Sequence, residues 1–158
     1  MSNTKSLSVA QYILDQCKEV GHGAITPMQL IKLVYIAHGY MLGKHGRPLL
    51  GEQVQAWRYG PVVASVYHAV KCFGSEVVEE VPGAKKGFEF SQDEQKVMES
   101  VAKDYGKYNG ITLSSATHTP GTPWDQTWSE IGKNGPISND LIENFYEQIL
   151  RKREHSSL

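Results

Sequence analysis

The stretch from Thr26 to Gly46 constrains the fold of this chain most, because it reads as a helix that is apolar almost all round. Thr26 is a suitable N-cap, Pro27 suits the first helical position, and Gly46 can end the helix in a left-handed conformation. At about 100° per residue, the exceptions share one narrow stripe: Gln29, Lys32, Gly39 and Gly43. We therefore expect residues 27–45 to form a buried central helix, with Lys32 either solvated or in contact with a partner.

Several features bear on where the chain works. The central stretch is too short and interrupted to span a bilayer, which takes roughly 20 consecutive apolar residues. The first residues lack the apolar run of a secretory signal. The two cysteines, Cys17 and Cys72, are too few for a cysteine zinc site and suit a reducing compartment. We expect a cytoplasmic protein with no membrane contact, no metal and no cofactor.

The composition favours one folded domain. The 158 residues are 40% hydrophobic and 21% charged, which is ordinary for a globular protein. We expect a single domain over residues 1–158, with a frayed tail at residues 152–158. The formal net charge of −1 provides no long-range attraction for a polyanion and argues against nucleic-acid binding. The basic run at residues 151–153 falls at the end of the last expected helix, where cations are favourable without any ligand.

Local patterns place the other elements around the central helix. Alternating residues predict a strand over residues 54–59, and residues 77–81 and 86–90 have the pattern of a hairpin. Pro61 suits the first position of a helix, and Ser8 suits a helix cap. The remaining apolar periodicities predict helices over residues 8–20, 92–105, 113–118, from 123 onward and 138–151. The expected fold class is α+β, mainly α, with about six helices around residues 27–45 and a small antiparallel sheet.

Histidines supply the few candidates for chemistry. His38 and His45 share a face of the central helix, and with His118 they could form a metal or general-base site. Their spacing is unspecific, and a lone histidine on an apolar face is more often a buried hydrogen-bonding residue. No phosphate-binding glycine loop and no serine nucleophile elbow occurs. We therefore expect no catalytic residue, and a metal- or histidine-dependent hydrolase that uses His38 and His118 is an alternative.

Two aromatic groupings stand out. Trp57, Arg58 and Tyr59 follow one another at the end of the expected strand, and Trp124 and Trp128 share one helix face. Buried indoles usually belong to a core, which we expect for Trp57 and Trp124. Tryptophan, tyrosine and arginine also dominate the hot spots of protein interfaces. Arg58 alternates with Trp57, so it should point to the opposite side and is the better candidate for partner contact.

The order of these motifs resembles the SocA-like antitoxin domain, also called Panacea or the phage-associated GepA-type domain. The resemblance covers about residues 6–150 and rests on L-x-K-L-x-Y-x-A-H-G from Leu30, A-W-x-Y-G-P-V from Ala56, L-S-x-x-T-H from Leu113 and P-W from Pro123. A longer spacer, residues 119–122, precedes the last motif. The matching residues include those we expect in the core or at caps: Tyr35, His38, Trp57, Gly60, Pro61, Thr117, Pro123 and Trp124.

The resemblance implies a non-enzymatic antitoxin of a bacterial or prophage toxin–antitoxin system, with a role in phage defence. Such a protein neutralises the toxin encoded by an adjacent gene through direct contact, either by masking it or by delivering it to a protease. The partner-binding candidates are Lys32, Arg58, Tyr59 and His118. A DNA-binding regulator of its own operon is a further alternative. The sequence is also compatible with a homo-oligomer.

Overall fold

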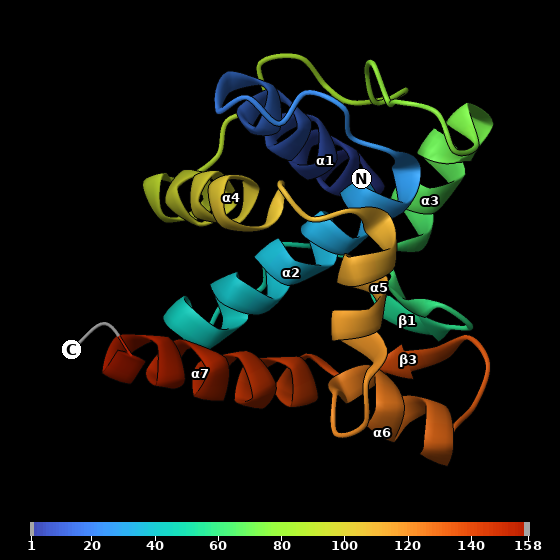
Figure 1. Ribbon diagram of the computed structural model, residues 1–158, viewed down its shortest axis with the longest axis vertical. Coiled ribbons are helices and arrows are strands. Elements are labelled where there is room, and N and C mark those ends of the chain that lie inside the picture. The colour runs from blue at the N-terminus through green and yellow to red at the C-terminus, as the bar shows by residue number, and fades with distance from the viewer. Residues whose placement is uncertain (1, 157–158) are drawn as a thin grey trace.

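Seven α-helices and a small sheet make up residues 2–156, the part of the chain that this computed structural model describes (Figure 1). The helices are α1 (Ser2–Glu19), α2 (Pro27–His45), α3 (Ala64–Val70), α4 (Gln92–Tyr105), α5 (Gly110–His118), α6 (Pro123–Glu130) and α7 (Asn139–Ser156), and the short 3₁₀ helix η1 (Lys71–Phe73) follows α3. The strands are β1 (Val54–Trp57), β2 (Gly60–Val62) and β3 (Gly135–Ile137). The expected class, α+β and mainly α, is confirmed.

Helix α2 is the central element, with the bounds that its sequence predicts. The Thr26 hydroxyl accepts a hydrogen bond from the Gln29 backbone N–H, and Gly46 ends the helix at φ 67°. Figure 1 shows α2 crossing the middle of the molecule, with α1 and α4 on one side and α7 on the other. From Pro27 to Leu42 every side chain except that of Met28 is buried. The prediction of a buried central helix is therefore confirmed.

The glycines of the α2 stripe explain how α7 packs so closely. A Cβ atom on Gly39 would lie 2.4 Å from the ring of Tyr146, and one on Gly43 would lie 2.8 Å from the backbone nitrogen of Glu147. Small residues at these two positions let the helix backbones approach. The stripe that looked polar in sequence is thus a packing surface rather than a solvated face.

The sheet departs from expectation at Gly60 and Pro61. These residues form β2, in which Pro61 pairs with Ala56 of β1, and the following helix begins only at Ala64. The strand order is β2-β1-β3, so Pro61 lies in an edge strand, where its missing N–H can be tolerated. The third strand, β3, comes from the segment before α7 and has no counterpart in the sequence prediction.

The predicted hairpin at residues 77–81 and 86–90 is wrong, since neither range forms a strand. Val78 and Val81 are buried, a spacing of three that does not fit alternation. Their N–H groups donate to the carbonyl of Ile25 and to Oε1 of Gln11 respectively. The segment therefore runs as a loop over α1 at the top of Figure 1, held by contacts with α1 and with the residues before α2.

Both terminal helices are longer than predicted. Ser8 lies inside α1 and caps nothing there; its buried hydroxyl accepts a hydrogen bond from the Lys85 N–H. Helix α7 continues to Ser156, past the expected end at Arg151. Arg153 holds this extension by donating to the hydroxyl of Tyr40. Of the expected frayed tail, residues 157–158 lie outside the described part. Within residues 2–156, no helix is long and apolar enough to cross a membrane.

Candidate partner-binding site

The turn between β1 and β2 is held by side chains from two neighbouring helices. The Trp124 indole N–H, from α6, donates to the Trp57 carbonyl at 2.6 Å. The Ser114 hydroxyl, from α5, donates to the Tyr59 carbonyl at 2.6 Å. Trp124 is 8% exposed and Ser114 is 6% exposed, so both donors are shielded from competing water. These two bonds fix the backbone on both sides of Arg58.

A third clamp comes from the central helix. The Lys32 ammonium, from α2, donates to the Pro61 carbonyl at 2.9 Å. Gly60 has φ 118°, and a Cβ atom there would lie 3.0 Å from the Lys32 Nζ and 3.3 Å from the Thr117 Oγ1. Both the backbone conformation and the close approach of lysine therefore require glycine. The Tyr-Gly-Pro part of the motif positions this turn against α2 and α5.

Lys32 is buried rather than solvated, with only 3% of its surface exposed. Removing an ammonium group from water disfavours its charged form, and burial lowers the pKa of Lys32 to about 7. The charged form of Lys32 is therefore much less favoured at neutral pH than that of an ordinary surface lysine.

The clamped turn presents Arg58 and Tyr59 to solvent. Tyr59 is 60% exposed, and the Arg58 guanidinium lies 5.5 Å from the centroid of its ring. The carbonyl bonds hold the turn backbone, so a partner would meet these two side chains on a fixed support. An exposed arginine and tyrosine on a rigid turn have the composition and pre-organisation of an interface hot spot.

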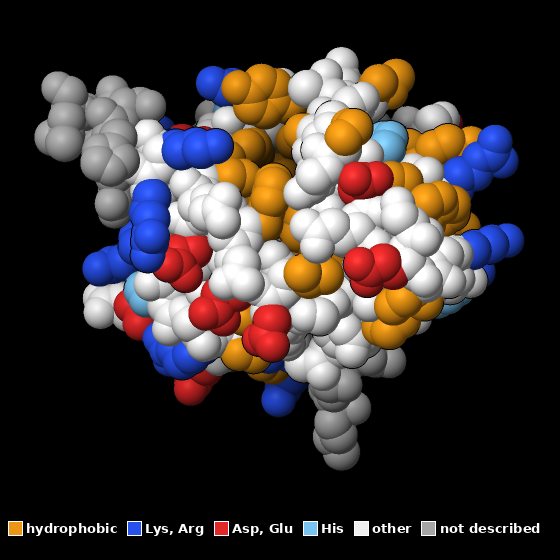
Figure 2. All heavy atoms as spheres, turned by 90° about the horizontal axis from the view of Figure 1, so that it is seen from below, with side chains coloured by type: hydrophobic (Ala, Val, Ile, Leu, Met, Phe, Trp, Pro, Cys, Tyr) orange, Lys and Arg blue, Asp and Glu red, His pale blue; other side chains and the backbone are white. Residues whose placement is uncertain are grey.

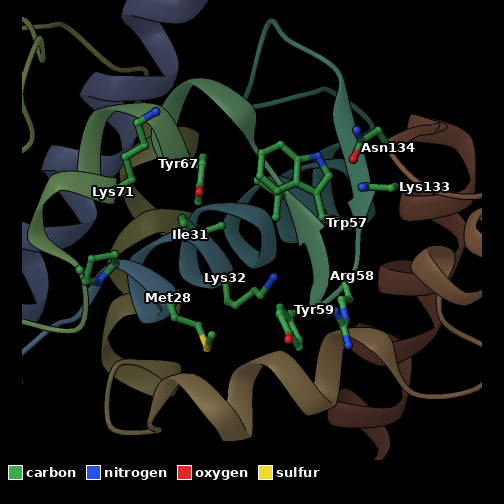
Figure 3. Close-up of a pocket in the computed structure, with 13 residues that line it drawn as sticks. Met28, Ile31, Lys32, Trp57, Arg58, Tyr59, Tyr67, Lys71, Lys133 and Asn134 are labelled. Atoms are coloured by element: carbon green, nitrogen blue, oxygen red, sulfur yellow. The ribbon is translucent and has the colours of Figure 1, made fainter.

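Beside the turn lies a cavity of about 510 Å³, which we call the Lys32 cavity (Figure 3). Figure 3 shows Lys32 in its middle, with the amino group turned toward Trp57 and Tyr59. Its lining comprises Pro27, Met28, Ile31, Lys32, Trp57, Arg58, Tyr59, Val62, Tyr67, Lys71, Gly74, Lys133 and Asn134. The described lining thus contains four basic residues and no aspartate or glutamate.

Trp57 forms a wall of this cavity, contrary to its expected place in the core. In β1, Val54 and Ala56 take the buried face, so the alternation puts Trp57 on the other face, where it is half-buried. Its ring packs edge-on against Tyr67 at a centroid distance of 4.8 Å. Arg58 lines the same cavity from the β1–β2 turn.

His118 and Trp124 lie behind the turn. The rings of His118 and Trp124 meet edge-on at 5.2 Å, and Trp128 stacks on Trp124 at 5.1 Å. His118 Nδ1 hydrogen-bonds the Ser114 carbonyl, and the His118 side chain is half-buried. Pro123 opens α6 at the first position, as its motif predicts. His118 therefore supports the turn through its neighbours and does not line the Lys32 cavity.

His38 is fully buried on the far part of α2, as a hydrogen-bonding residue should be. Its Nε2 lies 3.0 Å from Asn139 Oδ1, and its Nδ1 accepts from the Leu50 N–H at 3.2 Å. The partners differ from the backbone carbonyl usual for such a histidine. Burial lowers the pKa of His38 to about 4. Nearby Tyr35, 1% exposed, packs edge-on against Tyr146.

The histidine arrangement gives the hydrolase alternative no support. Both ring nitrogens of His38 are engaged by protein groups, so neither is available as a general base. In the described part of the chain, no three or more His, Cys, Asp or Glu side chains are grouped so that they could hold a metal ion.

The charge around the Lys32 cavity contrasts with that of another face. Figure 2 shows the molecule from below, the side of α6 and α7 in Figure 1, with acidic side chains near the middle and basic ones toward both margins. Hydrophobic side chains gather in the upper part of that view. The charges in that view are mixed, whereas the charged residues that line the cavity are all basic.

Residues 30–125 match the family described as "Antitoxin SocA-like, Panacea domain". The chain belongs to this family. It is also 30% identical over 143 residues to Antitoxin SocA of Caulobacter vibrioides (strain NA1000 / CB15N), a similarity that covers 84% of this chain and 72% of the relative. No solved structure matches the chain. Membership of the SocA-like family supports an antitoxin role and suggests a regulatory rather than a catalytic one.

The family match contains all three donors that clamp the turn, namely Lys32, Ser114 and Trp124. Sequence reasoning named Lys32 and Trp124 but gave Ser114 no role, although it lies in the L-S-x-x-T-H motif. Lys71 and Lys133 were also missed. Lys133 reaches the cavity through the segment before β3, whose pairing with β1 is long-range and leaves no local signal.

Proposed function

We propose that this protein is an antitoxin that neutralises a toxin protein by direct, non-catalytic binding, with Arg58 and Tyr59 at the centre of the contact. The observation that carries the proposal is the β1–β2 turn, whose carbonyls are bound by side chains from α2, α5 and α6 while these two side chains stay exposed. Family membership supports the antitoxin role, and the turn supplies a surface suited to protein contact.

A rigid turn favours affinity because ordering a flexible loop on binding costs free energy. Immobilising one rotamer-rich side chain costs about 0.5–1.5 kcal/mol, and a flexible backbone adds to this cost. Here the turn backbone is already fixed, and Arg58 lies against the ring of Tyr59 before any partner arrives. Ordering the turn on binding therefore costs little free energy.

Co-expression with the product of the adjacent gene tests the proposal. We expect that product to arrest growth alone, and growth to recover when this protein is co-expressed and co-purifies with it. Recovery should fail for the variant Tyr59→Ala and persist for Arg151→Ala, an exposed arginine on α7 whose described ion pair is with Glu147. A neighbouring product that is neither toxic nor bound would refute the proposal.

Regulation of its own operon by DNA binding stays a separate prediction. The formal net charge of −1 gives the chain no long-range attraction for DNA. Salt-dependent binding to the operator region is the measurement that would establish it.

A further inference from the structure

The amino group of Lys32 has donors to spare. An ammonium group carries three N–H donors, and the Pro61 carbonyl takes one of them. No other hydrogen bond or ion pair of Lys32 occurs among the residues that the structure describes. A buried ammonium is normally paired with a carboxylate. Here the cavity lining offers none, so a carboxylate that pairs with Lys32 must come from outside the described chain.

Three more cations surround the same cavity. Arg58 lies at its edge on the turn, Lys71 comes from η1, and Lys133 comes from the segment before β3 (Figure 3). Lys71 and Lys133 flank the cavity from opposite sides in that view. Four of the 16 lysine and arginine residues therefore gather here with none of the 17 acidic ones, in a chain whose net charge is only −1. The local charge selects an anion.

The walls of the cavity favour an apolar group beside that anion. Trp57, Tyr67, Ile31 and Met28 provide aromatic and aliphatic surface around Lys32. A volume of about 510 Å³ greatly exceeds what one carboxylate fills, given that a water molecule occupies about 30 Å³ in the liquid. The space suits a carboxylate together with a neighbouring apolar side chain.

The rim of the cavity indicates a protein rather than a free small molecule. Tyr59 is 60% exposed and Met28 is 39% exposed, and both belong to the lining. An enclosing site would bury most of a small ligand and leave little apolar rim. The exposed rim also continues into the Arg58–Tyr59 surface, so a chain that contacts the turn can extend into the cavity.

We infer that the Lys32 cavity receives an aspartate or glutamate side chain of a bound protein partner, with the apolar residue next to it packed against Trp57 and Tyr67. This inference rests on the proposed function for the identity of the partner, the toxin. It adds the chemistry of the recognised segment: an acidic residue adjacent to an apolar one. The carboxylate completes the ion pair that Lys32 lacks within the described chain.

Recognition of this kind has a pH signature. A carboxylate binds the ammonium form of Lys32, whose pKa is about 7 in the free protein, so binding takes up a proton at and above that pH. Affinity should be greatest between about pH 5 and 6, where the carboxylate is ionised and Lys32 is protonated, and it should fall by up to tenfold per unit above pH 7. The other titratable groups that line the cavity are Arg58, Tyr59, Tyr67, Lys71 and Lys133. We assign the pH dependence to Lys32, because it is the buried cation of the lining and its burial lowers its pKa toward neutral pH.

Two capped dipeptides test the chemistry without the toxin. Acetyl-Leu-Glu-amide and its matched control acetyl-Leu-Gln-amide are titrated into the full chain at pH 6, with the Trp57 indole N–H observed by NMR. We expect the glutamate peptide to bind at least about tenfold more tightly, as a charge-assisted pair predicts. The variant Lys32→Met should abolish this preference. Lys44→Met, an exposed lysine on the same helix, should preserve it.

Several results would overturn the inference. These are equal affinity for the two peptides, a preference that survives in Lys32→Met, no shift of the Trp57 signal, or inorganic phosphate binding as tightly as the glutamate peptide. The toxin provides a separate arm. If Lys32→Met binds the toxin as tightly as wild type does at pH 6, the inference fails while the proposed function stands. If peptide preference holds but no toxin is neutralised, the proposed function fails and the cavity chemistry stands.

Discussion

At the scale of single residues, Lys32 is the side chain whose surroundings differ most from what its type prefers. It was identified from its place on the stripe of α2, but its burial could not be predicted. The covering groups include the Gly60–Pro61 backbone, which is distant in sequence. A local pattern shows which face a residue occupies and says little about what covers that face.

The burial of the Lys32 amine should make the free energy of unfolding depend on pH. Its pKa falls from 10.5 to about 7 on folding, so between these values the unfolded chain binds more protons and stability rises with pH. Below pH 7 Lys32 is protonated in both states, so the folded state bears the full cost of burying its charge. We compare the unfolding free energy of Lys32→Met with that of wild type. The value for the variant minus that for wild type should decrease by up to about 4 kcal/mol between pH 7 and 10. Urea unfolding at several pH values measures it; a difference independent of pH would show that Lys32 is not desolvated.

At the scale of elements, the capping signal at Thr26 was reliable because it involves neighbouring residues, whereas Ser8, also predicted as a cap, lies inside α1. Ser91, Thr122 and Ser138 accept cap hydrogen bonds in the same way at the starts of α4, α6 and α7. The hairpin at residues 77–90 failed because Val78 and Val81 are buried by α1 and the segment before α2 rather than by a strand partner. Strand β3 escaped prediction because three residues that include a proline carry no local strand signal.

The packing of α2 on α7 depends on Gly39. A Cβ atom there would overlap the ring of Tyr146, which is 5% exposed and confined by Tyr35 and Tyr40. Overpacking of this kind costs about 1–3 kcal/mol. We expect Gly39→Ala to lower the free energy of unfolding by that amount. Gly23→Ala is the matched control, because a Cβ atom there meets nothing within 4 Å. Equal stabilities of the two variants would contradict the close packing.

At the scale of the whole molecule, the central helix and the small sheet serve one arrangement. Helices α2, α5 and α6 each donate one side-chain hydrogen bond to a backbone carbonyl of the same turn. These bonds connect the core helices directly to the exposed surface that carries Arg58 and Tyr59. The sequence identified the aromatic and basic residues of this region. It could not identify how the turn is held or the cavity beside it, because the hydrogen-bond acceptors are backbone carbonyls, which every residue carries.

The most direct test of this account is the dissociation constant of the complex with the adjacent-gene toxin, measured by titration calorimetry for wild type and Tyr59→Ala. Truncating a hot-spot residue costs about 2 kcal/mol or more, so we expect Tyr59→Ala to raise the dissociation constant by about 30-fold or more. Tyr59→Phe, which keeps the ring, should retain most of the affinity, and Arg151→Ala should match wild type. A Tyr59→Ala complex as tight as the wild-type complex would contradict the claim that the clamped turn is the binding surface.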